Sequence, residues 1–390
     1  MQNLPSLTIQ PKSASIKNGL LPPQKTEGIL EEMNKKKHYN FLDYYKIFAM
    51  MLIVWYHSFI SYRTDVLHNA SSIIVYILYS LAALGVPVFF TVNGFLLFDR
   101  PIQWKSHLAK IVRIILKTAV WGSIALAVLM TARGESIHLS TFLKDLVHLR
   151  QGYINHLWFM EALVYIYILF PVIKWIYDRN KILFYIGFYA SVALFFFIPS
   201  WRQLDEFLLY YNISLLHAGT KIFDMLPVKY FMYSTTYFVL GGLLKNILPK
   251  LPSYKNIKHT VVSGGILAAA LAVHILYGFW KSAAQHIWFD SVWSGYDSIF
   301  TLTAVAALFM FGPSLDAHVS TNLIKKCAAN TLGIYFIHPV LIKLSMPFMQ
   351  NILEKSTALN LVYAVIIFIF SFILTLGLRK IPVVKWLFEI

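Results

Sequence analysis

The run ALNLVYAVIIFIFSFILTLGL, residues 358–378, contains no acidic or basic side chain. A helix needs about 20 mostly apolar residues to cross the roughly 30 Å hydrocarbon core of a bilayer, so this run predicts a transmembrane helix. Similar runs recur from residue 41 onward, and the 390-residue chain is 58% hydrophobic and only 13% charged. This composition excludes a disordered protein, a secreted disulfide-rich module and a sizeable water-soluble catalytic domain.

We therefore predict an all-α, polytopic integral membrane helix bundle of about ten transmembrane helices. Their approximate bounds are 41–62, 72–98, 112–130, 156–177, 181–200, 230–247, 260–280, 291–311, 330–349 and 358–378. The second run is too long for one upright helix, and Gly85, Val86 and Pro87 within it predict a kink or a break. Residues 1–38 lack helical periodicity and a signal-peptide layout, which predicts a disordered cytoplasmic tail before a membrane domain at 39–390.

Basic residues outnumber acidic ones, 34 to 18, and they gather in short segments between the apolar runs. In a multispanning protein this distribution marks cytoplasmic loops, so the excess charge indicates topology and not a nucleic-acid partner. An even number of spans then places both termini in the cytoplasm. The expected location is the cell membrane, as a multi-pass protein of a bacterial inner or plasma membrane. The single Cys327 excludes an internal disulfide and a cysteine-rich metal site, and we predict no metal.

The first predicted span holds ionisable groups on one helical face. Lys46 and His57 are eleven positions apart, almost three whole turns, which places them about 16 Å apart along the helix axis. Asp43 precedes Lys46 by three positions and can pair with it. Ionisable side chains are costly inside a membrane, so each is a functional candidate. The alternatives are a structural histidine bonded to a neighbouring helix and an Asp43–Lys46 pair that anchors the helix end.

The spacing of Leu42, Asp43, Lys46 and His57 resembles the first span of the membrane-bound acyltransferase family 3, which includes O-acetyltransferases of surface polysaccharides. Other segments that resemble this family follow in order: GVPVFFTVNGFLL at 85–97, WK to KIVRI at 104–114, HLWF at 156–159, YFVLGGLL at 237–244 and LGIYFIH at 332–338. Three positions depart from the family pattern, because Lys46 replaces the usual arginine, Asn93 a common serine and Lys117 a frequent proline. Lysine keeps the charge of arginine but loses its planar fork, which alters a clamp on phosphate or carboxylate.

The resemblance implies transfer of an acyl group, usually acetyl, from acyl-coenzyme A to a hydroxyl of a surface or lipid-linked polysaccharide. Cytoplasmic coenzyme A carries several phosphate charges, so its site requires cations at the inner mouth. Arg100, Lys105, Lys110 and Arg113 are predicted there, although the positive-inside bias alone also accounts for them. Lys110 and Arg113 are three positions apart, a spacing that lets both address one anion.

A thioester is already activated, so the demanding step is removal of a proton from the acceptor hydroxyl. A neutral imidazole suits this task, and His57 is the candidate general base; covalent transfer through His57 is the open alternative. The resemblance also marks His338, which orients substrate, relays a proton, or is a structural histidine bonded to a carbonyl freed by Pro339. The predicted catalytic residues are His57, Lys46, Asp43, Glu161 and His338. The predicted substrate-binding residues are Arg113, Lys110, Lys105, Arg100, Asn93, His156, Trp158 and Tyr335.

Glu161 and Asn93 have alternative interpretations of their own. Glu161 either holds an imidazolium during catalysis or pairs with a lysine, because a carboxylate inside a span is costly unless it is paired. Asn93 either donates to the developing thioester oxyanion or caps the break in the second span. Two predicted outer segments are long, 131–155 and 201–229. The aromatic and acidic residues of the second suit a sugar-binding surface, and the alternative is amphipathic helices at the membrane interface.

A different class of function also fits the sequence. A transporter or flippase that exports a polysaccharide or lipid-linked sugar has the same number of spans, a broken helix and buried polar groups. The Lys46 and His57 spacing and the ordered resemblance favour the enzyme. The expected donor substrate is acetyl-CoA or another acyl-CoA. The other expected partners are a polysaccharide or lipid-linked glycan acceptor, membrane lipid, and a second copy or a glycan-synthesis protein, but no nucleic acid.

Overall fold

The computed structural model describes residues 38–58, 70–149, 152–214, 217, 232–250, 256–315 and 321–388. Within these ranges every regular element is a helix, which confirms the predicted all-α class. The residues from Asn40 onward fold as one unit, and all following statements concern that unit. Apart from His38, the predicted tail 1–38 lies outside the described residues, and its disorder stays a prediction.

Helices occupy all ten predicted spans. They are α2 (Asn40–Ser58); α3 (Ala70–Ser80), η1 (Leu81–Leu84) and α4 (Gly85–Leu97) in one run; α5 (Trp104–Ala132); α7 (Trp158–Arg179); α8 (Lys181–Val192), η3 (Ala193–Phe197) and α9 (Ile198–Tyr210) in a second run; α11 (Met232–Ile247); α12 (Ile257–Gln285); α13 (Ile299–Phe311); α15 (Thr331–Leu353); and α16 (Thr357–Leu378). Shorter helices lie between and after them: α6 (Leu139–Val147), η2 (Gly152–Leu157), η4 (Leu248–Lys250), η5 (Trp293–Gly295), η6 (Gly312–Ser314), α14 (Asn322–Ala328), α17 (Pro382–Lys385) and η7 (Trp386–Phe388).

Seven helical stretches of the described chain are long and apolar enough to cross a membrane. They are Ser72–Leu97, Trp104–Ala132, Leu139–Arg179, Lys181–Tyr210, Ile257–Gln285, Thr331–Leu353 and Thr357–Leu378. The other three predicted spans lie outside this set, since α11 has 16 residues, α13 has 13, and the 19-residue α2 carries Asp43 and Lys46. The structure is thus consistent with a membrane helix bundle, while the count of ten and the cytoplasmic termini stay predictions.

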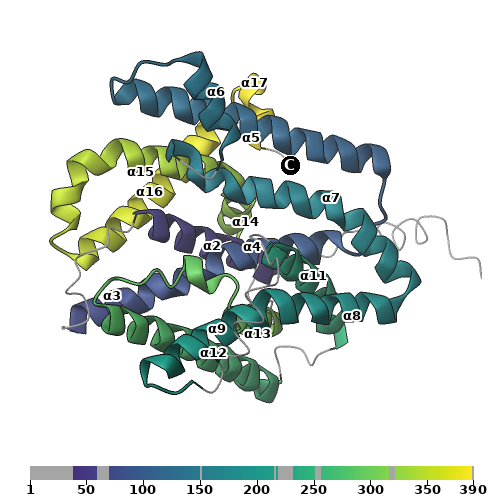
Figure 1. Cartoon of the computed structure of the whole chain (residues 1–390). Coiled ribbons are helices and arrows are strands. Elements are labelled where there is room, and N and C mark those ends of the chain that lie inside the picture. The colour runs from purple at the N-terminus through teal and green to yellow at the C-terminus, as the bar shows by residue number, and fades with distance from the viewer. Residues whose placement is uncertain are drawn as a thin grey trace, which may run out of the picture. The chain divides into compact units, whose positions relative to one another are not determined.

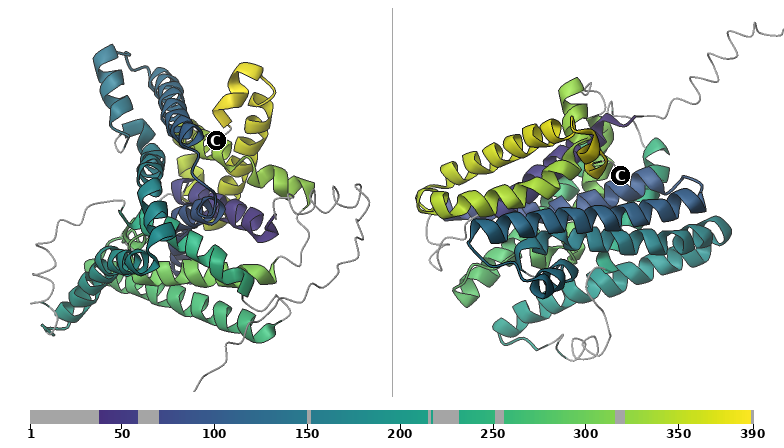
Figure 2. Two further views of the ribbon diagram at one scale, coloured as in Figure 1. Left: turned by 90° about the vertical axis from the view of Figure 1, so that its right-hand side faces the viewer. Right: turned by 90° about the horizontal axis from the view of Figure 1, so that it is seen from above.

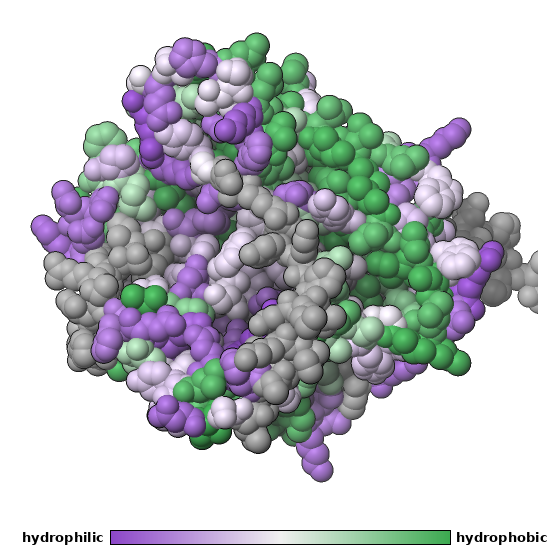
Figure 3. Space-filling model, viewed as in Figure 1, coloured by the Kyte–Doolittle hydropathy of each residue, from purple (hydrophilic) through white to green (hydrophobic). Residues whose placement is uncertain are grey.

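The outward faces of several helices expose large apolar side chains. Ile182 on α8 is 75% exposed and Val362 on α16 is 54% exposed, and α5 and α12 expose similar residues. Figure 3 shows hydrophobic side chains spread over much of one face of the molecule. Soluble monomers rarely expose contiguous apolar patches of this kind, whereas lipid tails accommodate them.

The break predicted in the second span is present, and it lies one turn before Pro87. The four residues of η1 form a 3₁₀ turn between α3 and α4. Because proline lacks an N–H, Pro87 cannot donate to the carbonyl of Ala83, which lies within η1. The helix therefore tightens at η1 and continues as α4.

The predicted span 291–311 was wrong at its start, because α13 begins only at Ile299. Residues 286–298 form a loop instead, which contains the short 3₁₀ turn η5. The side chain of Asp290 accepts hydrogen bonds from the backbone N–H groups of Val292 and Trp293, both at 3.0 Å, and the side chain of Ser298 caps α13 by accepting from Phe300 N. These local side-chain acceptors compete with helix formation, so an apolar sequence here is not helical.

The two long predicted outer segments are partly helical. Segment 131–155 contains α6, none of whose residues is buried, which agrees with an amphipathic helix. In segment 201–229 the run that begins with α8 stays helical to Tyr210, and residues 215–216 and 218–229 lie outside the described residues. Sugar binding by segment 201–229 therefore stays a prediction.

Helices α2 and α4 lie in the middle of the bundle (Figures 1 and 2). Helix α2 packs against α4, α14, α15 and α16, and α4 packs against α11. Helices α5 and α7 pack on each other, as do α12 and α13. The first predicted span is therefore a central helix, and its residues face several neighbours at once.

Two glycines allow α4 and α11 to touch backbone to backbone. A Cβ on Gly94 would lie 1.7 Å from the carbonyl oxygen of Phe238, and a Cβ on Gly241 would lie 2.0 Å from that of Thr91. Small residues permit such close approach between membrane helices. This contact fixes α4, and with it Asn93 and Phe89, relative to the rest of the bundle.

Candidate active site

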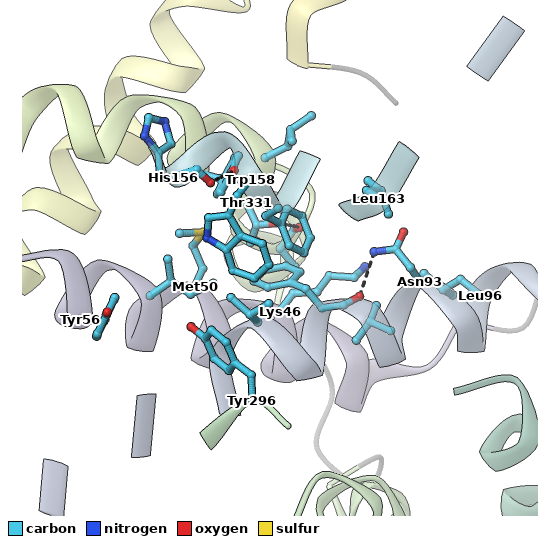
Figure 4. A pocket seen from close by; sticks show the side chains of 18 of the residues that line it. Lys46, Met50, Tyr56, Asn93, Leu96, His156, Trp158, Leu163, Tyr296 and Thr331 are labelled. Atoms are coloured by element: carbon cyan, nitrogen blue, oxygen red, sulfur yellow. Dashed lines mark hydrogen bonds between the residues drawn. The ribbon is translucent and has the colours of Figure 1, made fainter. Parts of the chain in front are cut away.

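A cavity of about 720 Å³ runs through the middle of the bundle beside α2 and α4 (Figure 4). Its wall combines residues of α2, α4, α5, α7 and α15 with residues of the loop 286–298. Figure 4 shows Asn93 and Leu96 toward one end and Tyr56 and His156 toward the other. We call these two ends the cationic end, which carries Lys46, Asn93, Arg100 and Lys110, and the histidine end, which carries Tyr56, His57 and His156.

The cationic end joins positive side chains from three parts of the chain. Lys46 comes from α2, Arg100 follows α4, and Lys110 comes from α5. The ammonium group of Lys110 lies 4.8 Å from the centre of the Tyr167 ring, a cation–π contact that holds this side chain against the wall. Arg100 is exposed as well as part of the wall, so the cavity is open to solvent near this residue.

Lys46 keeps the partner that its spacing predicts. Its Nζ lies 4.0 Å from Oδ1 of Asp43. Asp43 itself is buried and does not line the cavity. The carboxylate therefore balances the charge of Lys46 from behind, while the lysine faces the cavity.

Three histidines gather at the other end. The rings of His57 on α2 and His338 on α15 have centroids 5.4 Å apart, and those of His156 and His338 are 6.4 Å apart. His57 and His156 line the cavity, whereas His338 is fully buried behind them. Helices α2 and α15 and the turn η2 thus bring together residues that are distant in sequence.

The hydrogen bond of His338 fixes its tautomer. Its Nδ1 lies 2.8 Å from the carbonyl oxygen of Ile334. A carbonyl only accepts, so Nδ1 carries the proton and Nε2 has a free lone pair. Nε2 has no hydrogen-bond partner among the described residues, and it therefore remains available to accept an N–H.

Tyr335 positions the third histidine. Its hydroxyl donates to the backbone oxygen of His156 at 2.5 Å, and both residues are buried parts of the wall. His156 lies in η2, directly before α7, and Trp158 follows it on the first turn of α7. The HLWF segment and the LGIYFIH segment therefore meet at one place in the fold.

Comparison with known proteins identifies the family. The model of the acyltransferase domain, acyltransferase family 3, matches residues 39–380. The chain belongs to this family. Comparisons with curated proteins and with solved structures gave no match. The family assignment supports a membrane acyltransferase, and it agrees with the resemblance carried by the ordered sequence segments.

Five residues predicted for the site of this acyltransferase do not line the cavity: Asp43 and His338, described above, and Lys105, Arg113 and Glu161. Lys105 and Arg113 are exposed on α5, and the Arg113 side chain turns back to donate to the carbonyl oxygen of Ala109 at 3.1 Å. Glu161 is half-buried on the first turn of α7. Lys110 and Arg113 were predicted to bind the same anion, but only Lys110 faces the cavity. The face of α5 that carries Lys110 is the one that packs on α7.

The residues of the acyltransferase cavity that the sequence did not predict include Tyr56, Trp293 and Tyr296. Tyr56 precedes His57, and its hydroxyl donates to Oδ2 of Asp290 at 2.9 Å. Trp293 and Tyr296 belong to the loop that the sequence assigned to a span. No periodic signal marks them, since their place depends on the hydrogen bonds of Asp290.

Proposed function

We propose that this membrane protein transfers an acetyl or other short acyl group from cytoplasmic acyl-CoA to a hydroxyl of a surface or lipid-linked polysaccharide, with His57 as the general base. The observation that carries the proposal is that one cavity has cations at one end and His57 at the other. By helical rise, Lys46 and His57 are about 16 Å apart along α2, comparable to an extended pantetheine arm. Composition also fits an exporter, but the acyltransferase family assignment favours the enzyme.

The cationic end suits the donor. Coenzyme A carries phosphate groups, which cations bind through charge-assisted hydrogen bonds. Arg100 lies where the cavity opens, and Lys46 and Lys110 line the wall beyond it. The amide of Asn93 donates one hydrogen to the carbonyl oxygen of Phe89 at 2.9 Å, which leaves its second N–H for the donor. Asn93 lies toward the same end of the cavity as Leu96 (Figure 4). This position favours a contact between its amide and the pantetheine arm over the predicted hydrogen bond to the thioester oxyanion.

The histidine end suits the proton transfer. The acceptor oxygen loses its proton to His57 as it attacks the thioester carbon, and a new C–O bond forms. The tetrahedral intermediate then collapses with cleavage of the C–S bond, and the imidazolium returns the proton to the departing sulfur of coenzyme A. The products are an ester and free coenzyme A, so atoms and charges balance without a metal or a redox partner.

His338 suits the role of positioning residue. Its Nε2 is an acceptor, and its ring lies 5.4 Å from that of His57. An N–H of His57 directed to this lone pair leaves the other nitrogen of His57 unprotonated and free to act as base. The imidazolium formed in the transition state then gains an acceptor that is already in place.

Removing the Lys110 ammonium is expected to weaken donor binding. Lys110→Ala should raise KM for acetyl-CoA about tenfold with a small change in kcat, because the phosphates are bound equally in the ground and transition states. Arg100→Ala should act in the same direction. The effects of Lys105→Ala and Arg113→Ala should be smaller, since these exposed residues do not line the cavity. Initial rates over a range of acetyl-CoA concentrations measure this order, and equal effects at all four positions would contradict it.

Removing the acceptor behind His57 is expected to slow the chemical step. His338→Ala should lower kcat by roughly 10- to 100-fold, with little change in KM for either substrate, because His338 contacts neither. His338→Gln retains an amide oxygen that can accept an N–H, and it should recover part of the rate. A structural role alone predicts lower protein levels with an unchanged kcat for the folded fraction, so specific activity per folded molecule separates the two.

The function itself is tested on surface glycans. Mass spectrometry of glycans from cells with and without the chain should show an added mass of about 42 Da per acetyl group, whereas an exporter moves glycan without changing its mass. A glycan of unchanged mass but altered location would replace the acyltransferase with the exporter.

A further inference from the structure

One side of the cavity is aromatic. Trp158 and Trp293 have ring centroids 5.2 Å apart, Trp293 and Tyr296 5.8 Å, and Trp158 and Tyr296 6.0 Å. All three line the cavity, and we call them the aromatic platform. Trp158 and Tyr296 are buried, but Trp293 is 43% exposed and the wall residue Asn155 is exposed. The platform therefore extends from inside the cavity to the molecular surface.

The carboxylate of Asp290 organises the loop that carries the platform. Its Oδ1 accepts from the Tyr79 hydroxyl at 2.9 Å and from the backbone N–H of Trp293 at 3.0 Å, and its Oδ2 accepts from the Tyr56 hydroxyl at 2.9 Å. One side chain thus ties the loop to α3 and to α2. The Tyr56 ring in turn lies 5.2 Å from the His57 ring, between centroids.

A further hydrogen bond holds the loop at Tyr296. The buried hydroxyl of Tyr237 on α11 donates to the backbone oxygen of Tyr296 at 3.0 Å. The platform is therefore held from both sides relative to His57. A preformed aromatic surface of this kind binds with a low cost of ordering.

The charges near the platform disfavour an anion. The Lys and Arg side chains of the cavity wall are Lys46, Arg100 and Lys110, all assigned to the cationic end. Lys343 on α15 does not line the cavity, and its ammonium group donates to the backbone oxygen of Tyr153. The carboxylate of Asp290 lies directly behind Tyr56 and Trp293. Lys343 acts electrostatically on His57 and His156, but from outside the wall. A negatively charged acceptor at the platform therefore contacts no Lys or Arg side chain other than the three of the cavity wall, and the carboxylate of Asp290 repels it.

We propose that the aromatic platform, positioned by Asp290, binds the acceptor by stacking and selects an uncharged sugar ring. The apolar face of a pyranose lies on the indole rings, while its hydroxyl groups reach Asn155 and His57. This proposal rests on the proposed acyl transfer to a hydroxyl, and it names the part of the acceptor that the enzyme recognises. Trp293 is its specificity-determining residue and Asp290 its positioning residue.

Paired acceptors test the charge selectivity. The full-length protein in lipid nanodiscs is given labelled acetyl-CoA and one acceptor at a time. The acceptors are the methyl glycosides of glucose, galactose and mannose, the uronate that corresponds to each, and 1-octanol. We expect at least one neutral glycoside to be acetylated at least about tenfold faster than its uronate and than octanol. A uronate or octanol as the better acceptor overturns the proposal while leaving acyl transfer intact. A wild-type protein that acetylates none of these compounds refutes the proposed function, and the platform's role with it.

Variants then test the residues. Trp293→Ala should raise KM for the neutral glycoside roughly tenfold or more, with KM for acetyl-CoA within about twofold of wild type. Trp293→Phe keeps a smaller ring, so its KM for the neutral glycoside should lie between those of wild type and Trp293→Ala. Trp175→Ala is the matched control, because Trp175 on α7 is 55% exposed and does not line the cavity. An unchanged acceptor KM in folded Trp293→Ala and Trp293→Phe contradicts stacking.

Asp290→Asn gives a readout that a purely structural residue would not move. The amide keeps the shape of the carboxylate but removes its charge and one acceptor oxygen. We expect the acceptor KM to rise and the preference for a neutral glycoside over its uronate to narrow at least about threefold. A loss of rate with the preference unchanged would assign Asp290 to folding alone.

Discussion

The His57→Ala variant is expected to lose acyl transfer by at least about 10³-fold, because the hydroxyl proton then has no acceptor at the reacting centre. His57 lines the cavity from the central helix α2, and its neighbour His338 offers an acceptor for only one of its two nitrogens. His156 also lines this end, but its ring lies farther from that of His338, 6.4 Å against 5.4 Å between centroids. Transfer of labelled acetyl from acetyl-CoA to glycan, measured per folded molecule in the membrane, checks the expectation.

The control for this variant is His138→Ala, since His138 is an exposed histidine directly before α6 and does not line the cavity. It should retain the wild-type rate. Both variants should reach wild-type levels in the membrane. Persisting transfer in His57→Ala would refute the assignment. Label that stays on the wild-type protein at His57 without acceptor would replace the general base with a covalent carrier.

The sequence predicted the helices well because the signal for each is local. A mostly apolar run of about 20 residues predicts a membrane helix wherever it stands. The start of α13 was missed for the opposite reason. Whether residues 291–298 are helical depends on Asp290, whose carboxylate bonds to Tyr56 on α2, 234 positions away, as well as to its own loop. Hydropathy contains no information about such a contact.

In the candidate site, too, some residues could be predicted from local sequence, while the place of others depends on packing between distant helices. Lys46 and His57 belong to one helix, so their spacing alone places both on one face, and both line the cavity. The face of α5 that turns inward could not be read from spacing. It is set by packing on α7, where His107 bonds to the carbonyl oxygen of Tyr167 at 2.7 Å and Lys110 lies over the Tyr167 ring. Lys110 therefore reaches the cavity, while Arg113 does not.

Two of the segments that resemble the family have a structural reason for their glycines. In the contact between α4 and α11, Gly94 lies against the backbone of Phe238 and Gly241 against that of Thr91, so a Cβ on either glycine would meet the other helix's backbone. Neither glycine lines the cavity. The neighbouring residues Phe89 and Asn93 do, so the glycines act on the site through the position of α4.

Gly94→Ala adds a single methyl group, yet it is expected to destabilise the fold strongly. Its Cβ would lie 1.7 Å from the carbonyl oxygen of Phe238, and backbone atoms cannot rotate away as a side chain can. The helices must separate, which costs at least the roughly 1–3 kcal/mol typical of overpacking and opens gaps along the whole contact. Size-exclusion chromatography of detergent-solubilised protein should show most of the folded, monodisperse fraction lost.

Gly187→Ala provides the matched control, because Gly187 lies on the exposed face of α8 and its added Cβ would meet no atom within 4 Å. Both substitutions add one methyl group within a helix, so propensity, which favours alanine over glycine, acts equally on them. The control should keep its folded fraction and its acyl transfer. Similar losses in the two variants would mean that the defect arises from alanine within a helix and not from the contact between α4 and α11. A normal folded fraction in Gly94→Ala would show that α4 and α11 do not pack this closely in the membrane.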